Sequence, residues 1–365
     1  MGPMSRAAAV LAIAIMLAAS TPALVLGATW SKPQLVFGSA NCSSVAATID
    51  TAGRYHLAAS CGESIRYAVS DGDRQWTTRL FTHRFHDIDL YPQVATDGDF
   101  VYVAYTRAIR CCAGMCDDGL ESQGVFYRRR SLPDGSWSAN RRIGSPGTSL
   151  GSFDVADGII HATTWDPRDG QMSYETLNRG VSDRHPIPGA NGTSLRIGTD
   201  GRARIAYPVA GSIRYGLFNG SGFWRTRVTG GSGGLGPTLA LGEGDRAYLL
   251  WTHYDPGSCG VEPVPSTRDG TYFATNPSGK WASERLTTEL GATSLVTNVE
   301  TGRVHGLLAS DRSLTYYTRS ATGVWNHTDV VPGSASSPVI RQDQTTGLLL
   351  VAFISQGRVN VLTKP

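Results

Sequence analysis

The chain has 365 residues, of which 41% are hydrophobic and 17% charged, and its formal net charge is only +3. Acidic and basic residues are mixed along the sequence, so no polybasic segment is available for nucleic acid or lipid headgroups. The composition therefore excludes proteins that bind polyanions through bulk charge, and we expect no nucleic-acid partner.

Residues 1–28 predict a cleavable secretion signal. Arg6 is followed by the apolar run Ala7–Ala19, and small residues mark an exit near Gly27. A membrane span needs about 20 apolar residues, and Ser20 to Pro22 interrupt the run before that length. We expect a secreted, extracellular protein that is not inserted in a membrane, with one domain over residues 29–365.

A repeated pattern runs through this domain: an aromatic residue, a short polar turn with glycine, and then usually tryptophan. The clearest copies run from Tyr67 to Trp76, Tyr127 to Trp137, Tyr215 to Trp224, Phe273 to Trp281 and Tyr316 to Trp325. A degenerate copy runs from Tyr174 to Val181, and Trp30 matches only the end of a repeat. Regular repetition of this kind indicates a repeat architecture.

Each repeat predicts four short strands, A to D, and no segment has a sustained helical period. Strand A opens near Cys42, Pro92, Ser149, Ser194, Pro237 and Ser294, and a seventh unit from Ser337 to Leu362 lacks strand D. We expect an all-β, seven-bladed β-propeller in which residues 30–37 complete the last blade. Without that closure the terminal blades would leave unpaired strand edges.

One slot of strand B is repeated and is expected to be a packing position. It holds His56, Tyr102, His161, Arg204, Tyr248, His305 and Leu350.

Six cysteines in an exported chain predict disulfides. Cys42 and Cys61 oppose each other across a hairpin that turns at residues 50–53, because 42 plus 61 equals 49 plus 54. Of Cys111, Cys112, Cys116 and Cys259, we expect one of the adjacent pair to bond Cys116 and the other Cys259. The spacing disfavours the alternative of a zinc site, and we expect no metal and no cofactor.

The turns between strands C and D carry a family resemblance. They are Leu132–Trp137, Asn219–Trp224, Asn276–Trp281 and Ser320–Trp325. They resemble, in shortened form, the turns of Asp-box (BNR-repeat, sialidase-like) β-propellers, with Asp134 the nearest match to the box aspartate. The resemblance implies a propeller whose ligand site lies on the face opposite these turns.

That opposite face is formed by the D-to-A and B-to-C connections, and its residues are the candidate site. Two B-to-C connections are long, residues 107–123 and 253–269, and hold the four remaining cysteines. A bridge from Cys259 would tie them into a lid over a recessed cleft, and local bridges within each loop are the alternative. The expected ligand-binding residues, where aromatic rings stand beside charged groups as in sugar sites, are His83, Asp89, Trp165, Asp166, Arg168, Trp251, His253 and Asp255.

Catalysis at this face would use His86, Asp87, Arg110 and Tyr254. A sialidase-like hydrolase needs two carboxylates, or a tyrosine nucleophile with a carboxylate base. The chain has no Arg-Ile-Pro signature and seven blades in place of six. The set His86, Tyr254 and Arg110 resembles that of seven-bladed uronate polysaccharide lyases. We expect a monomer that recognises carbohydrate or a glycoconjugate, with either enzyme or a protein-interaction scaffold as alternatives.

Overall fold

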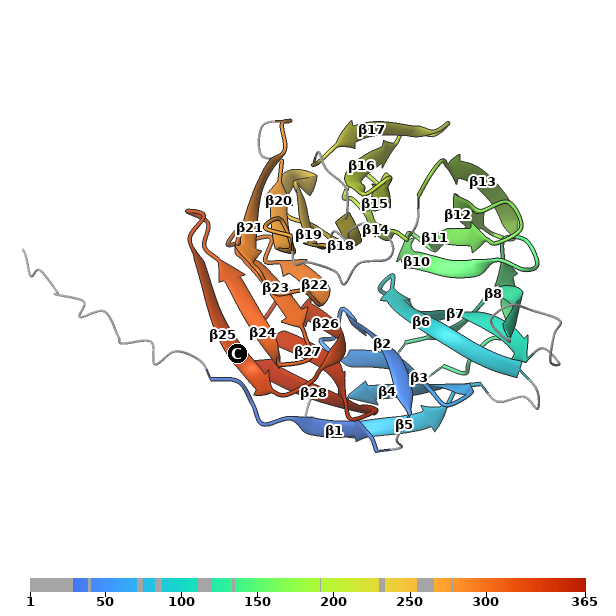
Figure 1. The fold of residues 1–365 in the computed structure, drawn as a ribbon. Helices are drawn as coiled ribbons and strands as arrows, with labels where there is room; N and C mark the ends of the chain where they lie inside the picture. Colours follow the sequence, from blue (N-terminus) through green and yellow to red (C-terminus); the bar gives the residue numbers. More distant parts are fainter. Residues whose placement is uncertain are drawn as a thin grey trace, which may run out of the picture.

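The computed structural model describes residues 29–38, 41–70, 75–82, 87–110, 120–132, 135–190, 192–229, 234–254, 266–276 and 279–365. Within these residues the strands form seven four-stranded antiparallel sheets around one axis (Figure 1). The innermost strands of consecutive sheets contact one another around the whole ring, including the last sheet and the first. The prediction of an all-β, seven-bladed propeller is confirmed.

In blades 1 to 6 the strands follow one another in the chain from the axis outward, and in blade 7 the outer strand is β1. Blades 1 and 2 contain β2 (Cys42–Ile49), β3 (Tyr55–Cys61), β4 (Ser64–Ser70), β5 (Trp76–Leu80), β6 (Asp87–Thr96), β7 (Phe100–Arg110), β8 (Leu120–Ser131) and β9 (Arg141–Ile143). Blades 3 and 4 contain β10 (Ser149–Ala156), β11 (Ile159–Asp166), β12 (Gln171–Asn178), β13 (Val181–Ile187), β14 (Ser194–Ile197), β15 (Ala203–Val209), β16 (Ser212–Phe218) and β17 (Phe223–Arg227).

Blades 5 and 6 contain β18 (Gly234–Leu241), the 3-10 helix η1 (Glu243–Asp245), β19 (Ala247–His253), β20 (Gly270–Thr275), β21 (Ala282–Thr287), β22 (Ala292–Thr297), β23 (Val304–Ala309), β24 (Ser313–Arg319) and β25 (Trp325–Pro332). Blade 7 contains β26 (Ser336–Gln342), β27 (Leu349–Ser355), β28 (Arg358–Lys364) and β1 (Gln34–Phe37). No helix among these described segments is long and apolar enough to cross a membrane.

Antiparallel order gives the ring two different faces. The connections from first to second strand and from third to fourth strand lie at one end, which we call the turn face. The connections from second to third strand and from one blade to the next lie at the other end, which we call the loop face. The predicted site belongs to the loop face.

The aromatic repeat has a packing explanation. A tryptophan at the start of an outer strand packs edge-on against the third-strand aromatic of the preceding blade, with ring centroids 4.9 to 5.3 Å apart. The pairs are Trp137 with Tyr67, Trp281 with Tyr215 and Trp325 with Phe273. Edge-on contacts stabilise aromatic pairs beyond the area that they bury. At these three positions the sequence repeat therefore marks the contact between neighbouring blades.

Trp30 makes the same contact at the start of the chain. Its ring lies edge-on against Tyr316 of blade 6 at 5.0 Å. Further along, β1 pairs antiparallel with β28, with Gln34 opposite Val361 and Phe37 opposite Val359. Trp30 thus occupies the position of an outer-strand tryptophan in blade 7, as its match to the end of a repeat indicates.

Serine hydroxyls fasten several innermost strands to the next blade. Ser152, Ser194 and Ser294 each accept the backbone N–H of a residue in the following innermost strand at 3.0 Å. Because neighbouring blades share no backbone ladder, these bonds satisfy N–H groups that face the axis. They also fix the height of one blade against the next.

The repeated slot of strand B is a packing position, as predicted. All its seven side chains are buried. In three blades the histidine Nδ1 lies 2.5 to 2.7 Å from a third-strand tyrosine hydroxyl: His56 with Tyr67, His161 with Tyr174 and His305 with Tyr316. Burial lowers the pKa of His161 and His305 to about 4, so both rings are neutral at pH 7.

These two histidines predict acid sensitivity. Their pKa is about 4 in the folded chain against the ordinary 6.5, so the unfolded chain binds more protons between these values. The free energy of unfolding is expected to fall as pH drops from 6.5 to 4, by up to about 3 kcal/mol for each histidine. Urea melts across this range should be flatter for His161→Gln/His305→Gln, which keeps an acceptor without titrating. Equal slopes for the two proteins would contradict the assignment.

The predicted bridge between Cys42 and Cys61 is present, and the two residues are opposite each other in the hairpin of β2 and β3. The register that we predicted is correct at the cysteines but wrong at the turn, where Ile49 is opposite Tyr55. A β-bulge between Cys42 and Ser44 accounts for the difference of one residue.

Blade 2 is longer than predicted. β6 begins at Asp87 in place of Pro92, and β7 and β8 continue to Arg110 and from Leu120. Much of the predicted 107–123 loop is therefore a hairpin extended toward the loop face. The other predicted long loop, 253–269, agrees with the end of β19 at His253 and the start of β20 at Gly270.

Candidate functional site

The candidate residues divide between those that the structure describes and those that it does not. His83, His86, Asp255, Cys111, Cys112, Cys116 and Cys259 lie outside the described residues. The expected bridges between the long loops, and the lid that they would form, lie there too. The other candidates belong to blades 2, 3 and 5, at the loop face.

Asp89, expected to bind ligand, is instead part of a buried ion pair. Its carboxylate accepts two hydrogen bonds from Arg107, at 2.9 and 3.1 Å, and only 2% of the residue is exposed. The Arg107 guanidinium also lies over Phe126 and 3.4 Å from Asp87. The pair joins β6 to β7 inside blade 2, so Asp89 is occupied and Asp87, 19% exposed at its side chain, is the accessible carboxylate.

Arg110 forms an exposed ion pair with Glu63 of blade 1. Its Nη2 lies 2.8 Å from Oε1, and the two side chains are 70% and 52% exposed. This contact ties the extended hairpin of blade 2 to its neighbour at the loop face. No contact in the described part of the chain joins Arg110 to Tyr254 or Asp87, the other described members of the expected catalytic set.

In blade 3, Asp166 and Arg168 pair with each other. Arg168 donates from Nε and Nη2 to the two carboxylate oxygens at 2.9 and 2.7 Å. These hydrogen bonds hold the pKa of Asp166 below its ordinary value, so the group is a carboxylate and unsuited to general-acid catalysis. Trp165 is half-buried and packs toward blade 4. Arg168 remains 64% exposed on the loop face.

In blade 5, Trp251 is a core residue and presents no surface to a ligand, contrary to expectation. It is 1% exposed, stacks on Tyr272 and packs between blades 4 and 5. A tryptophan outside the usual repeat position drew attention to it, but a central strand buries that position. His253 lies edge-on to Tyr272, and both His253 and Tyr254 are half-buried at the loop face.

The innermost strands enclose an axial channel of about 570 Å³, lined by residues of every blade. That volume is within the range of small-molecule sites. Toward the loop face the lining includes the polar residues Gln93, Thr193, Thr293 and Ser337 beside Pro237, Ala292 and Pro338. None of Asp87, Arg110 and Tyr254 lines the channel, so the described catalytic candidates do not converge there, and Trp165, expected to bind ligand, does not line it either.

A strained aromatic residue lies in β6 on the loop-face side of Gln93, outside the lining of the channel itself. Tyr91 is 57% exposed and has φ 53°, in the left-handed region that bulky residues rarely adopt. It lies in a β-bulge of β6, two residues before Gln93 of the lining. The same bulge, with a positive φ before proline, recurs at Gly236 and Ser337. Tyr91 is therefore held toward solvent by a feature of the repeat.

Sequence reasoning missed the charged residues of the channel: Asp154, Arg196 and Arg341. They occupy equivalent positions of strand A, where other blades have Thr48, Ala95, Ala240 and Val296. A charged residue in a slot that is otherwise small or apolar was the available signal.

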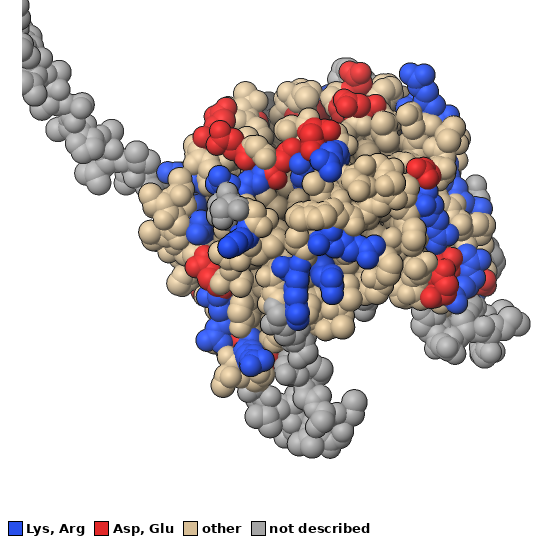
Figure 2. All heavy atoms as spheres, turned by 90° about the horizontal axis from the view of Figure 1, so that it is seen from above, with Lys and Arg blue, Asp and Glu red and all other residues tan. Residues whose placement is uncertain are grey.

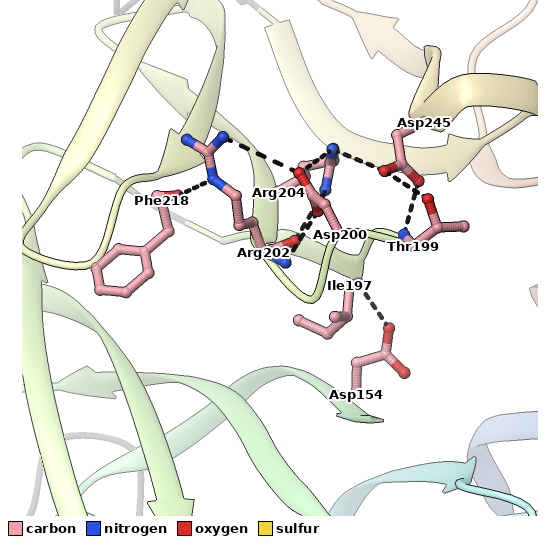
Figure 3. Close-up of polar contacts among 8 residues, drawn as sticks. All are labelled: Asp154, Ile197, Thr199, Asp200, Arg202, Arg204, Phe218 and Asp245. Carbon is pink, nitrogen blue, oxygen red and sulfur yellow. Dashed lines mark hydrogen bonds and ion pairs between the residues drawn. The ribbon is translucent and has the colours of Figure 1, made fainter. Parts of the chain in front are cut away.

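Asp154 has a structural task. Its Oδ1 accepts the backbone N–H of Val155 at 3.0 Å. Its Oδ2 accepts the backbone N–H of Ile197 at 3.1 Å (Figure 3). Beside this bond, the turn after β14 is linked to η1, since Arg204 donates to Asp200 and Asp245 at 2.8 and 3.0 Å (Figure 3). The carboxylates here join blades 3, 4 and 5 at the turn face.

The outer wall of the ring carries charges of both signs. Figure 2 shows Lys and Arg spread among uncharged residues over the wall, with carboxylates gathered along its upper edge. Among the described residues, no group of three or more His, Cys, Asp and Glu side chains is arranged to hold a metal ion.

Comparisons with known proteins show the propeller fold alone. No protein-family model and no curated protein matches the sequence. Similar solved structures include virginiamycin B lyase from Staphylococcus aureus with quinupristin, with TM-score 0.60 and 12% identity over 92% of this chain and 99% of that chain. A β-propeller domain from Myceliophteria thermophila has TM-score 0.55 and 12% identity over 90% and 99%. Trypanosoma rangeli sialidase with sialic acid has 0.52 and 8% over 89% and 54%.

Proposed function

We propose that this chain is a secreted propeller that recognises carbohydrate at its loop face, at the entrance of the axial channel. The observation that carries the proposal is Tyr91, an exposed aromatic ring two residues before Gln93, which is one of several polar residues of the channel lining. A sugar has an apolar face that stacks on a ring and hydroxyls that need hydrogen-bond partners. Gln93, Thr193 and Thr293 supply such partners.

The strain at Tyr91 supports a functional role. A non-glycine residue with positive φ costs about 1–3 kcal/mol and is found preferentially at functional sites. Blade 5 has glycine at the equivalent position, Gly236, which adopts φ 55° without that cost. Tyr91 in blade 2 therefore lowers the free energy of unfolding while it exposes an aromatic ring. Bulges next to binding sites commonly redirect a side chain in this way.

Other features support the same assignment. The disulfide between Cys42 and Cys61 fits an oxidising compartment outside the cell. The similar Trypanosoma rangeli sialidase was solved with sialic acid, which is a sugar. We also propose that the chain is a divergent Asp-box propeller, that β1 closes the ring in the secreted protein, and that Cys259 ties the long loops into a lid. Asp87, Arg168 and His253 would complete the rim.

A glycan array tests the proposal, and Tyr91→Gly is the informative variant. It is expected to raise the free energy of unfolding by about 1 kcal/mol, because glycine relieves the positive φ. It should also weaken glycan binding by about 10-fold or more, since stacking on an aromatic ring is lost. A variant that is more stable and binds less separates function from folding.

Trp224→Ala is the matched control, because Trp224 is 56% exposed on β17, away from the axis. It should bind glycans as the wild type does. Absence of glycan binding by the wild type would overturn the proposal. Turnover of sialosides or uronate polymers would instead indicate a sialidase-like hydrolase or a polysaccharide lyase, and neither activity nor binding would leave a protein-interaction scaffold.

A further inference from the structure

The axial channel has a ring of equivalent positions near the turn face. Each innermost strand contributes one residue to it, directly opposite the strand B slot described above. The ring consists of Thr48, Ala95, Asp154, Arg196, Ala240, Val296 and Arg341, and all seven line the channel. Only three carry charge, and among the residues that the structure describes they are the only charged ones in the channel lining.

The two arginines of this ring lack carboxylate partners. Arg196 donates from Nη1 to the carbonyl of Leu195, and Arg341 donates from Nη1 to the carbonyl of Ile340, both at 2.8 Å. Within the described residues, neither guanidinium has a carboxylate oxygen within 4.0 Å. Both Asp154 oxygens are engaged by backbone N–H groups of blades 3 and 4. Most of the donors of each guanidinium thus have no acceptor among the described residues.

Arg341 is cationic at neutral pH. Burial and the neighbouring charge of Arg196 lower the pKa of Arg341 to about 9, which still leaves it protonated at pH 7. The two side chains belong to blades 4 and 7, three steps apart in a ring of seven, so they approach the axis from opposing sides. With one carboxylate against two guanidiniums, the enclosed ring has an excess positive charge.

We propose that Arg196 and Arg341 form a binding site for an oxyanion inside the axial channel. The shared chemistry is a phosphate, sulfate or carboxylate group that accepts the free guanidinium donors and offsets their repulsion. Thr48, on the same ring, adds a hydroxyl that can donate to the anion. The site is distinct from Tyr91 at the loop face and does not depend on carbohydrate recognition.

Calorimetric titration with inorganic phosphate, and separately with sodium glucuronate, tests the site at constant ionic strength. The wild type is expected to bind, and Arg196→Met and Arg341→Met should each weaken binding by about 10-fold or more, the worth of a charge-assisted hydrogen bond. If the arginine variants bind both phosphate and glucuronate more weakly, the site binds oxyanions in general. If only glucuronate binding is weakened, the site binds the carboxylate of an acidic sugar.

Two control variants and one conservative variant complete the test. Arg227→Met removes an arginine from the outer strand β17 and should bind phosphate as the wild type does. Tyr91→Gly should also leave phosphate affinity unchanged, so failure of the sugar proposal is separable from failure of this one. Arg341→Lys keeps the charge, is expected to fold, and should bind phosphate more weakly than the wild type. No binding to the wild type, or equal binding to all variants, would overturn the site.

Discussion

Removal of residues 29–37 is expected to lower the free energy of unfolding by more than about 5 kcal/mol, a large part of the stability of an ordinary domain. The deletion removes Trp30 from Tyr316, takes the buried Phe37 from the core between blades 1 and 7, and strips β1 from β28. It also turns β28 into an unpaired edge, which favours aggregation. Thermal melting and light scattering of the truncated and full chains measure both effects.

Two point variants separate packing from chain length. Phe37→Ala, at a side chain only 2% exposed, should cost about 3–5 kcal/mol. Leu35→Ser changes the neighbouring side of the same strand, where 49% of the residue is exposed, and should cost less than about 0.5 kcal/mol. A truncated chain that melts like the full chain would show that β1 contributes nothing to the closure of the ring.

The propeller could be predicted because aromatic residues of the sequence repeat form the contacts between neighbouring blades. Trp137, Trp281 and Trp325 each pack on the third-strand aromatic residue of the preceding blade, so the spacing of these residues reflects the spacing of the blades. The strand B slot was recognisable as a packing position because the same position repeats in every blade. Local pairing also placed Cys42 opposite Cys61.

The site was less predictable, because its residues come from different blades and are distant from one another in the sequence. Trp251 and Asp89 have the chemistry of ligand contacts, yet burial and Arg107 give them structural roles. Arg196 and Arg341 have no neighbour in sequence that reveals their shared channel. The extension of blade 2 depends on charged residues such as Arg107 pairing inside a hairpin, which weakens the alternation that identifies a strand.

Replacement of Asp89 by alanine is expected to lower the free energy of unfolding by about 3 kcal/mol or more, because it leaves the buried guanidinium of Arg107 without its main partner. The side chain of Arg107 is 7% exposed, and Asp87 at 3.4 Å compensates only in part. The double variant Asp89→Leu/Arg107→Met should regain most of the loss, since it leaves no buried charge. Urea unfolding of the single and double variants measures this coupling.

Glu63→Ala is the matched control, since it breaks another ion pair of the same hairpin in an exposed position, Arg110 with Glu63. Solvent screening makes such a pair worth less than about 1 kcal/mol. If Asp89→Ala cost no more than Glu63→Ala, Asp89 would not be held by the buried pair, and its carboxylate would again be available to a ligand at the loop face. A large difference instead leaves Asp87 as the carboxylate that a sugar at this face would contact in blade 2.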